Sequence, residues 1–321
     1  MTALDPIEDG RISPVTTGLA GLVALGAVVV AVLHRSALAG GAGQLLAADG
    51  EWLIFAAAAA CLIWISGTVM QMGVLADRPP LLRLFAVQVA GSFVNHVLPA
   101  GAGGLAVNVR FLRRQGMTRD AAFACQALNA SAGAVTHLAL LVATIAFAPP
   151  ALRTEASTRV DRLSDGSGGL VLAGVLVVLA AAAVLARRPL RAVRVRVVEE
   201  YRRLAAVATH PRRAAQLWAG ALALPVVHGI VLYGVLHAVG SPLPLGVVLA
   251  VYLGSSALSA LIPSPGGIGS LDVVLGAALV ASGLTVPAAV GGLLAYRFLT
   301  VWVPLVPGAW TLGVLVKRRI I

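Results

Sequence analysis

Long apolar runs with few internal charges recur along almost the whole chain. About 20 mostly apolar residues in a helix cross the roughly 30 Å hydrocarbon core of a bilayer. Because hydrocarbon cannot satisfy free backbone N–H and C=O groups, each run is predicted to be helical. The runs are Val15 to Leu33, Trp52 to Leu75, Leu81 to Leu98, Ala121 to Ala148, Gly168 to Ala186, Leu217 to Val239, Leu245 to Ile262, Ile268 to Ala281 and Pro287 to Val316.

The composition agrees with this pattern. The chain has 321 residues, of which 59% are hydrophobic and 12% are charged, and its mean hydropathy is +0.92. These fractions lie far from those of an ordinary soluble domain. The sequence therefore predicts an all-α integral membrane protein, with residues 1–321 forming a single transmembrane domain.

Basic residues in the short connecting segments predict which helix ends face the cytoplasm. The segment 187–216 carries nine arginines against two glutamates, and smaller basic clusters lie at 113–119 and 317–319. In the segment 149–167 three arginines are balanced by three acidic residues, which is typical of the outer side. We expect both termini to be cytoplasmic.

Two segments must then enter and leave the membrane on the same side: 81–113 on the cytoplasmic side and 245–283 on the outer side. Each has a Pro/Gly-rich apex, LPAGAGG at 98–104 and IPSPGG at 262–267. We therefore predict about six spanning helices plus two helical hairpins, either re-entrant or deep.

A short pattern recurs after each hairpin and indicates an internal repeat. GMTRDAA at 116–122 and GLTVPAA at 283–289 share G-[ML]-T-x-x-A-A. The first repeat would cover about 15–148 and the second about 168–316, in inverted orientation, as in many secondary transporters. A substrate site is then expected between the two apices. The alternative is a chance agreement of short strings in a Gly-rich protein.

The net charge of +11 also raises the question of a nucleic-acid partner. Basic residues beside membrane spans orient the chain and contact anionic headgroups, which accounts for the excess. We expect membrane lipids, anionic phospholipid in particular, and no nucleic acid. The basic loop 187–216 is interpreted either as an amphipathic helix on anionic lipid or as a topology signal alone.

Charged residues within the apolar runs are the main candidates for a site, because charge at membrane depth is costly. In the functional interpretation Arg110 and Arg297 converge on an anionic group, which a guanidinium grips in two places. Asp272 would hold an arginine while substrate is absent, or would bind a proton or a cationic headgroup. In the structural interpretation Asp272 pairs with one arginine, and Arg110 extends to the interface.

Polar residues beside the first apex are further candidates. Asn95, His96 and Asn108 would line a polar cleft, or would satisfy backbone groups that Pro99 frees. Three isolated histidines (His137, His228 and His237) match no metal spacing, and hydrogen bonds to neighbouring helices are expected for them. Cys61 and Cys125 are expected to be buried and reduced.

No catalytic motif appears in the sequence: GxSxG, HExxH and a Walker loop are all absent. The glycines at 101–104 interrupt an apolar helix and do not follow a strand, so they do not form a Rossmann fingerprint. We expect no enzymatic activity, no cofactor and no metal.

Three segments resemble the lysylphosphatidylglycerol synthase transmembrane, or flippase-like, family of bacterial and archaeal membrane proteins. They are SFVNHVLPAGAGGLAVNVRFLRRQGMTRDAA, SALSALIPSPGGIGSLDVVLGAAL and AYRFLTVWVPLVPGAWTLGVL, in the order of the family. The resemblance implies a multi-pass cell-membrane domain like the one that, in the two-domain synthases, helps to bring aminoacylated phosphatidylglycerol to the outer leaflet. The soluble aminoacyl-transferase domain of the two-domain synthases has no counterpart here, so synthase activity does not carry over.

By position, the resemblance places the family's Pro/Gly motifs at the two apices and its late Tyr-Arg pair in the last span. Asp272 stands where relatives often have Glu, whose longer side chain reaches further. The assigned residues are Pro99, Gly103, Gly104, Pro265, Gly266, Gly267, Gly269, Tyr296 and Arg297. Pro263, in the second apex, is a further candidate for the substrate site.

The leading hypothesis is a lipid translocase that takes a phospholipid or a lipid-linked anionic headgroup into a cleft between two inverted hairpins. One alternative is an ion-coupled carrier of small solutes. Another is a membrane accessory subunit of a lipid-modifying enzyme or glycosyltransferase, with that enzyme as partner. The lipid, the energy source and the oligomeric state do not follow from the sequence.

Overall fold

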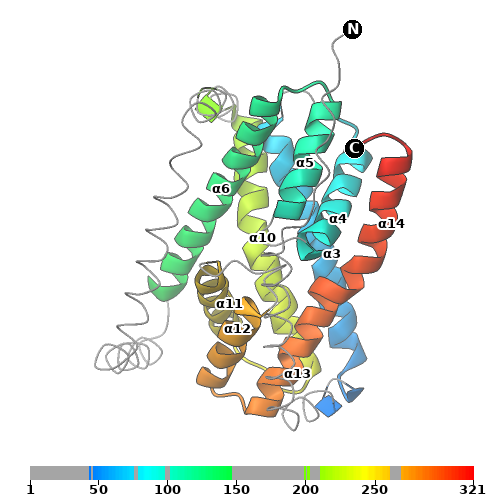
Figure 1. Ribbon diagram of the computed structural model, residues 1–321. Coiled ribbons are helices and arrows are strands. Elements are labelled where there is room, and N and C mark those ends of the chain that lie inside the picture. Colours follow the sequence, from blue (N-terminus) through cyan, green and yellow to red (C-terminus); the bar gives the residue numbers. More distant parts are fainter. Residues whose placement is uncertain are drawn as a thin grey trace, which may run out of the picture.

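A computed structural model describes residues 43–44, 46–75, 79–97, 102–146, 199, 201–202, 210–260 and 269–321. The regular elements in these ranges are all helical (Figure 1). They are α3 (Gly50–Val74), α4 (Leu81–Val97), α5 (Ala102–Arg114), α6 (Arg119–Ala146), α10 (Pro211–Ala238), α11 (Leu245–Ser259), α12 (Ser270–Ala281), α13 (Val286–Arg297), the π-helical η1 (Phe298–Trp302) and α14 (Val303–Lys317).

Four helical stretches in the described ranges are long and apolar enough to cross a membrane. They are Gly50–Val74, Arg119–Thr144, Pro211–Ala238 and the continuous stretch Val286–Lys317. Each coincides with an apolar run expected to span, which confirms the all-helical, multi-pass membrane class. The runs expected at 15–33 and 168–186, the loop 149–167 and most of the loop 187–216 lie outside the described residues.

Helices α3 and α10 pack side by side in opposite directions, and glycines allow the close approach. A Cβ atom on Gly73, near the end of α3, would lie 2.5 Å from the backbone nitrogen of Leu217, near the start of α10. A Cβ on Gly220 would lie 2.4 Å from the backbone nitrogen of Met70. Small residues of this kind are the usual means of tight helix packing in membranes.

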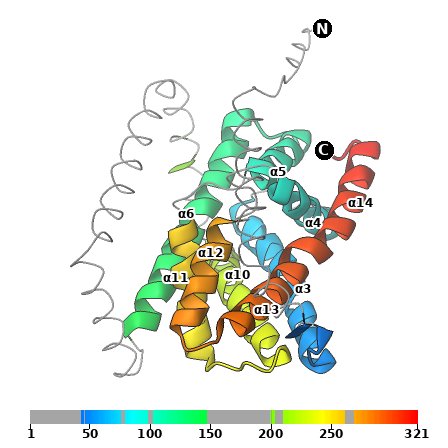
Figure 2. The same cartoon turned by 60° about the horizontal axis from the view of Figure 1, so that its bottom comes forward.

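Two pairs of short helices flank this central pair. In Figures 1 and 2, α4 and α5 lie near the end of the molecule where α14 ends, and α11 and α12 lie toward the opposite end. Their lengths run from 12 to 17 residues, or about 18 to 26 Å as α-helix. Each arm is therefore shorter than the hydrocarbon core of a bilayer. The apex residues 98–101 and 261–268 lie outside the described part.

The connections that follow these two pairs have the same local structure. Gly116 follows α5 and Gly283 follows α12. Both glycines have a left-handed backbone conformation, with φ of +91° and +101°. In each connection the backbone N–H of the residue after the glycine donates a hydrogen bond to a carbonyl of the preceding helix. A threonine hydroxyl then caps the helix that follows. The bonds run from Met117 N–H to Leu112 C=O (3.1 Å), Leu284 N–H to Leu279 C=O (3.3 Å), Ala121 N–H to Thr118 Oγ1 (3.2 Å) and Ala288 N–H to Thr285 Oγ1 (3.4 Å).

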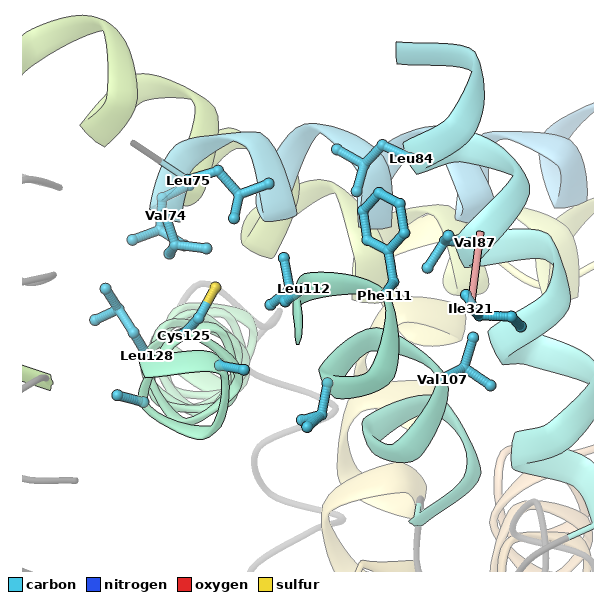
Figure 3. Packing of buried hydrophobic residues seen from close by; sticks show 14 of the residues in the cluster. Val74, Leu75, Leu84, Val87, Val107, Phe111, Leu112, Cys125, Leu128 and Ile321 are labelled. Carbon is cyan, nitrogen blue, oxygen red and sulfur yellow. The ribbon is translucent and has the colours of Figure 1, made fainter. Parts of the chain in front are cut away.

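Two apolar clusters lie toward opposite ends of the bundle. One joins the ends of α3, α5 and α14 with the starts of α4, α6 and α10; Figure 3 shows Val74, Phe111, Cys125 and Ile321 within it. The other joins the start of α3 and the end of α10 with α11, α12 and α13. The polar side chains described below lie between these two clusters.

The long helices expose many large apolar side chains. Large hydrophobic side chains such as Leu62, Val306 and Trp310 are exposed on the long helices, as expected for surfaces that contact lipid. Cys125 is buried as expected, but Cys61 is exposed on α3, so its expected burial is wrong. On a membrane helix an apolar residue is equally stable when it is buried in the protein and when it contacts lipid. Hydrophobicity alone therefore does not distinguish a buried position from a lipid-facing one.

Candidate functional site

A cavity of about 360 Å³, lined by both polar and apolar residues, lies at the middle of the two central helices. The α3 part of its wall runs from Ala60 to Gly67, and the α10 part includes Leu224 and His228. These positions are close to the midpoints of Gly50–Val74 and Pro211–Ala238, two of the candidate spans. A helix that crosses a bilayer has its midpoint near the bilayer centre, so the cavity lies at membrane depth.

One face of α4 supplies polar groups to this cavity. Gln88, Ser92, Asn95 and His96 follow one another at helical spacing, and all four line the cavity. The Ser92 hydroxyl accepts a hydrogen bond from Trp64 Nε1 at 3.2 Å and donates to the carbonyl of Val89 at 2.8 Å. This polar stripe is therefore tied to α3 as well as to its own helix.

Asparagine side chains hold α4 against α5. Asn95 Oδ1 accepts the backbone N–H of Gly104 at 3.2 Å. Asn108 Oδ1 accepts from Gln88 Nε2 at 3.1 Å, and its amide nitrogen donates to the Gly104 carbonyl at 2.9 Å. A Cβ atom on Gly103 would lie 2.2 Å from the backbone of α4 at Val94, so only glycine permits this approach. The two amides both line the cavity and join the two arms.

Arg297 brings a positive charge to the wall of the cavity. It ends α13, about 17 Å along the helix axis from Val286. Its Nε–H forms an ion pair and hydrogen bond with Asp272 Oδ1 on α12. The other oxygen of Asp272 accepts the N–H of Gly269 at 2.8 Å, so the carboxylate also caps its own helix. The ion pair therefore joins α12 to α13 at the cavity wall.

An aromatic group adjoins the arginine. His228 Nδ1 and the Tyr296 hydroxyl share a hydrogen bond of 2.9 Å between α10 and α13. The His228 ring stacks on that of Tyr252 from α11, with centroids 5.5 Å apart and planes 10° apart. All three rings line the cavity. Three helices are thus connected beside Arg297.

The lining defines what the cavity can bind. Among the described lining residues Arg297 is the one permanently charged side chain, and amide, hydroxyl and imidazole groups line the same cavity. Guanidinium and amide N–H groups suit an anion with several acceptor oxygens. The cavity is therefore suited to a phosphate-like or carboxylate group.

The structure brings together many of the residues that the sequence singled out. Arg110 is the exception, since its side chain is exposed and does not line the cavity, so it does not converge with Arg297. Gly103 and Gly269 lie beside the lining, and Gly269 takes a φ of +90° before α12. Asn95, His96, Gly104, Asn108, Tyr296 and Arg297 line the cavity. Pro99, Pro263, Pro265, Gly266 and Gly267 lie outside the described residues.

Sequence reasoning missed several lining residues. Gln88 and Ser92 share a helical face with Asn95, and this spacing was a readable signal. Tyr252 and Thr300 carried no such signal. They lie in separate helices, and only the tertiary structure shows that the two line the same cavity.

The other isolated histidines have structural partners. His137 Nε2 lies 3.0 Å from the Leu253 carbonyl and 3.1 Å from Ser256 Oγ, which links α6 to α11 as expected. His237 instead bonds within its own helix, to the Tyr233 carbonyl at 2.9 Å. Across the described ranges no three His, Cys, Asp or Glu side chains gather in a metal-binding group.

Comparison with known proteins identifies the family of the chain. No curated protein sequence matches the chain. The family model of the lysylphosphatidylglycerol synthase TM region, however, matches residues 18–308, which include every described residue that lines the cavity. The chain belongs to the family of lysylphosphatidylglycerol synthase transmembrane regions.

Proposed function

We propose that this protein is a lipid translocase, which accepts the anionic headgroup of a phospholipid in the cavity and leaves the acyl chains in the bilayer. The observation that carries the proposal is the position of Arg297: a cation beside a partly polar cavity at the middle of the spanning helices. Charge at this depth is costly unless it is paired or functional. Asp272 offsets the cost, and the arginine stays at the cavity wall.

The arrangement of the short helices supports an alternating mechanism. The pair α4 and α5 has its free ends near one end of the bundle, and the pair α11 and α12 near the other (Figure 1). Both are followed by the same glycine-and-threonine connection. We infer two inverted repeats whose hairpins open the cavity in turn to the two leaflets, the mechanism by which inverted-repeat transporters operate.

Family membership favours a lipid over a small solute as cargo. The matched model describes the membrane part of a synthase whose name contains a phospholipid. The same description also favours a second candidate, a membrane accessory subunit of a lipid-modifying enzyme. The two differ in whether the chain moves lipid by itself.

The test is a lipid-scrambling assay in liposomes that contain the purified full chain. Phosphatidylglycerol with a fluorophore on one acyl chain retains its natural headgroup, and an impermeant reductant quenches only outer-leaflet fluorophores. We expect quenching beyond the outer-leaflet fraction, and slower movement of phosphatidylcholine with the same label. Movement no faster than in protein-free liposomes would contradict a translocase that acts alone and would favour the accessory role.

Arg297→Ala should slow movement of the anionic lipid at least tenfold. Arg212→Gln provides the control. It removes one positive charge, as Arg297→Ala does, but Arg212 is exposed in the first turn of α10, away from the cavity. Equal loss in both variants would indicate a general charge effect and would contradict a specific role of Arg297.

A further inference from the structure

We propose that a groove at the end of the bundle where α14 ends binds the phosphate group of an anionic phospholipid. This groove is separate from the cavity, and the inference does not depend on transport. Its volume is about 620 Å³. The start of α4, the end of α5 and the residues after α14 form its walls. The lining includes Leu82, Arg83, Arg114, Gln115, Arg318 and Arg319.

The charged side chains that the structure describes in the lining of the groove are all positive. Four of these described lining residues are arginines and none of them is acidic. Within the described part of the chain, none of these four guanidinium groups forms an ion pair. Like charges held close together repel one another, and a bound anion would remove that repulsion. Guanidinium groups bind phosphate oxygens in a two-pronged geometry, so phosphate is the matching anion.

The fold holds two of these arginines in place with an apolar anchor. After α14 the chain reverses at Arg319, which has a φ of +54°, a conformation uncommon for a residue other than glycine. The Ile320 N–H bonds back to the Leu315 carbonyl at 2.9 Å. Ile321 then packs into the apolar cluster beside Val87 and Val107 (Figure 3). Arg318 and Arg319 are thereby fixed beside the ends of α4 and α5.

The groove is amphiphilic, which favours a lipid over free phosphate. Leu82 lines it next to Arg83 and is 79% exposed, and Leu81 on the same turn is 59% exposed. Exposed leucines at a helix end suit the glycerol and first acyl carbons of a lipid, with the arginines at headgroup level. Inorganic phosphate would use the arginines alone and would gain nothing from the leucines.

The experiment measures lipid binding to the purified full chain in detergent by native mass spectrometry and titration. The probes are dioleoylphosphatidylglycerol, dioleoylphosphatidylcholine with the same acyl chains, and sodium phosphate. The groove variant is Arg114→Gln with Arg318→Gln. The control is Arg113→Gln with Arg212→Gln, which removes two exposed arginines outside the lining, one of them adjacent to Arg114.

We expect wild type and control to bind phosphatidylglycerol more tightly than phosphatidylcholine. The groove variant should lose about 25-fold in affinity for phosphatidylglycerol, or about fivefold for each charge. The control measures any binding at the central cavity and any effect of net charge. If the groove variant does not fold, the single variants Arg114→Gln and Arg318→Gln, each expected to lose about fivefold, replace it.

Three results would overturn the proposal. Equal losses in groove and control variants would mean that these arginines act only through net charge or as topology signals. Equal affinity for the two lipids would exclude recognition of the anionic headgroup. Full competition by millimolar sodium phosphate, with no preference for the lipid, would identify a site for soluble anions.

Discussion

Asp272 holds Arg297 with one carboxylate oxygen while the other oxygen caps α12, so a single side chain both starts a short helix and positions the cation of the cavity. The pair is partly shielded: the side chain of Arg297 is 11% exposed and that of Asp272 is 25% exposed. Neutralising one partner would break this ion pair and leave the other charge at a mostly buried position. Because Arg297 is paired with Asp272, single and double substitutions of these two residues can distinguish a structural from a functional role of Arg297.

Arg297→Met combined with Asp272→Asn should preserve folding and abolish lipid movement. Each single neutral variant should lose up to about 3 kcal/mol of stability, because it breaks this mostly buried ion pair. The double variant removes both charges, and the asparagine keeps an oxygen for the Gly269 N–H. Melting temperature in detergent, measured beside the scrambling assay, checks both parts.

Arg297→Lys serves as the companion variant, because lysine keeps the charge without the two-pronged guanidinium. It should be nearly as inactive as Arg297→Ala. A double variant that moves lipid at the wild-type rate would show that the pair is structural and that Arg297 does not grip the headgroup.

Tyr296→Phe should lower the stability by about 0.5–1.5 kcal/mol, because it removes the hydroxyl that bonds His228 Nδ1 between α10 and α13. Tyr233→Phe is the matched control, since the Tyr233 hydroxyl forms no hydrogen bond among the described residues. Detergent melting curves of the two variants measure the difference. Equal melting temperatures would mean that the bond contributes no net stability.

Gly220→Ala should destabilise the central pair of helices by about 1–3 kcal/mol, the usual range for overpacking. The added Cβ would meet the α3 backbone at Met70, which cannot rotate away. Gly254→Ala is the control: it lies inside α11 with no atom within 4 Å of its new Cβ, and alanine is the better helix former. Chemical or thermal unfolding should separate the two variants, and a neutral Gly220→Ala would contradict the close packing of α3 and α10.

Cysteines introduced at Gln115 and Val286 should react with an impermeant thiol reagent from opposite sides of the membrane. Gln115 follows α5 and Val286 begins α13, and both are exposed. These positions avoid Gly116 and Gly283, whose positive φ would strain a cysteine. The background carries Cys61→Ala and Cys125→Ala. We expect cytoplasmic labelling at Gln115 and external labelling at Val286; labelling of both from one side would exclude the inverted arrangement.

Much of the helical framework could be predicted from the sequence. The expected apolar runs at 52–75 and 217–239 lie within a few residues of α3 and α10, because bilayer thickness constrains both length and composition. The two short pairs were predictable from the Pro/Gly apices together with the basic loops. The apex conformations themselves lie outside the described residues.

The site was only partly predictable. Asp272 and Arg297 were readable because a charge in an apolar run needs a partner. Arg110 carried the same signal, yet its side chain is exposed near the end of a short helix, where its distance from the apolar centre could not be inferred from sequence. Tyr252 and His228 reach the cavity through the packing of α10, α11 and α13, which no local pattern encodes.

The π-helical turn Phe298–Trp302 follows Arg297 directly, and the Val303 N–H closes it onto the Phe298 carbonyl. Each residue of an α-helix turns the chain by about 100°. The wide turn therefore sets the direction in which the side chains of α14 point relative to those of α13. Deleting one α-helical residue between this turn and Gly308 would leave the span almost as long but would rotate Gly308 by about 100°, away from Phe93 on α4. It would also rotate Arg318 and Arg319 away from the groove. The cavity and the groove therefore share one rotational register, which substitutions in α14 preserve and a one-residue insertion or deletion in its α-helical part does not.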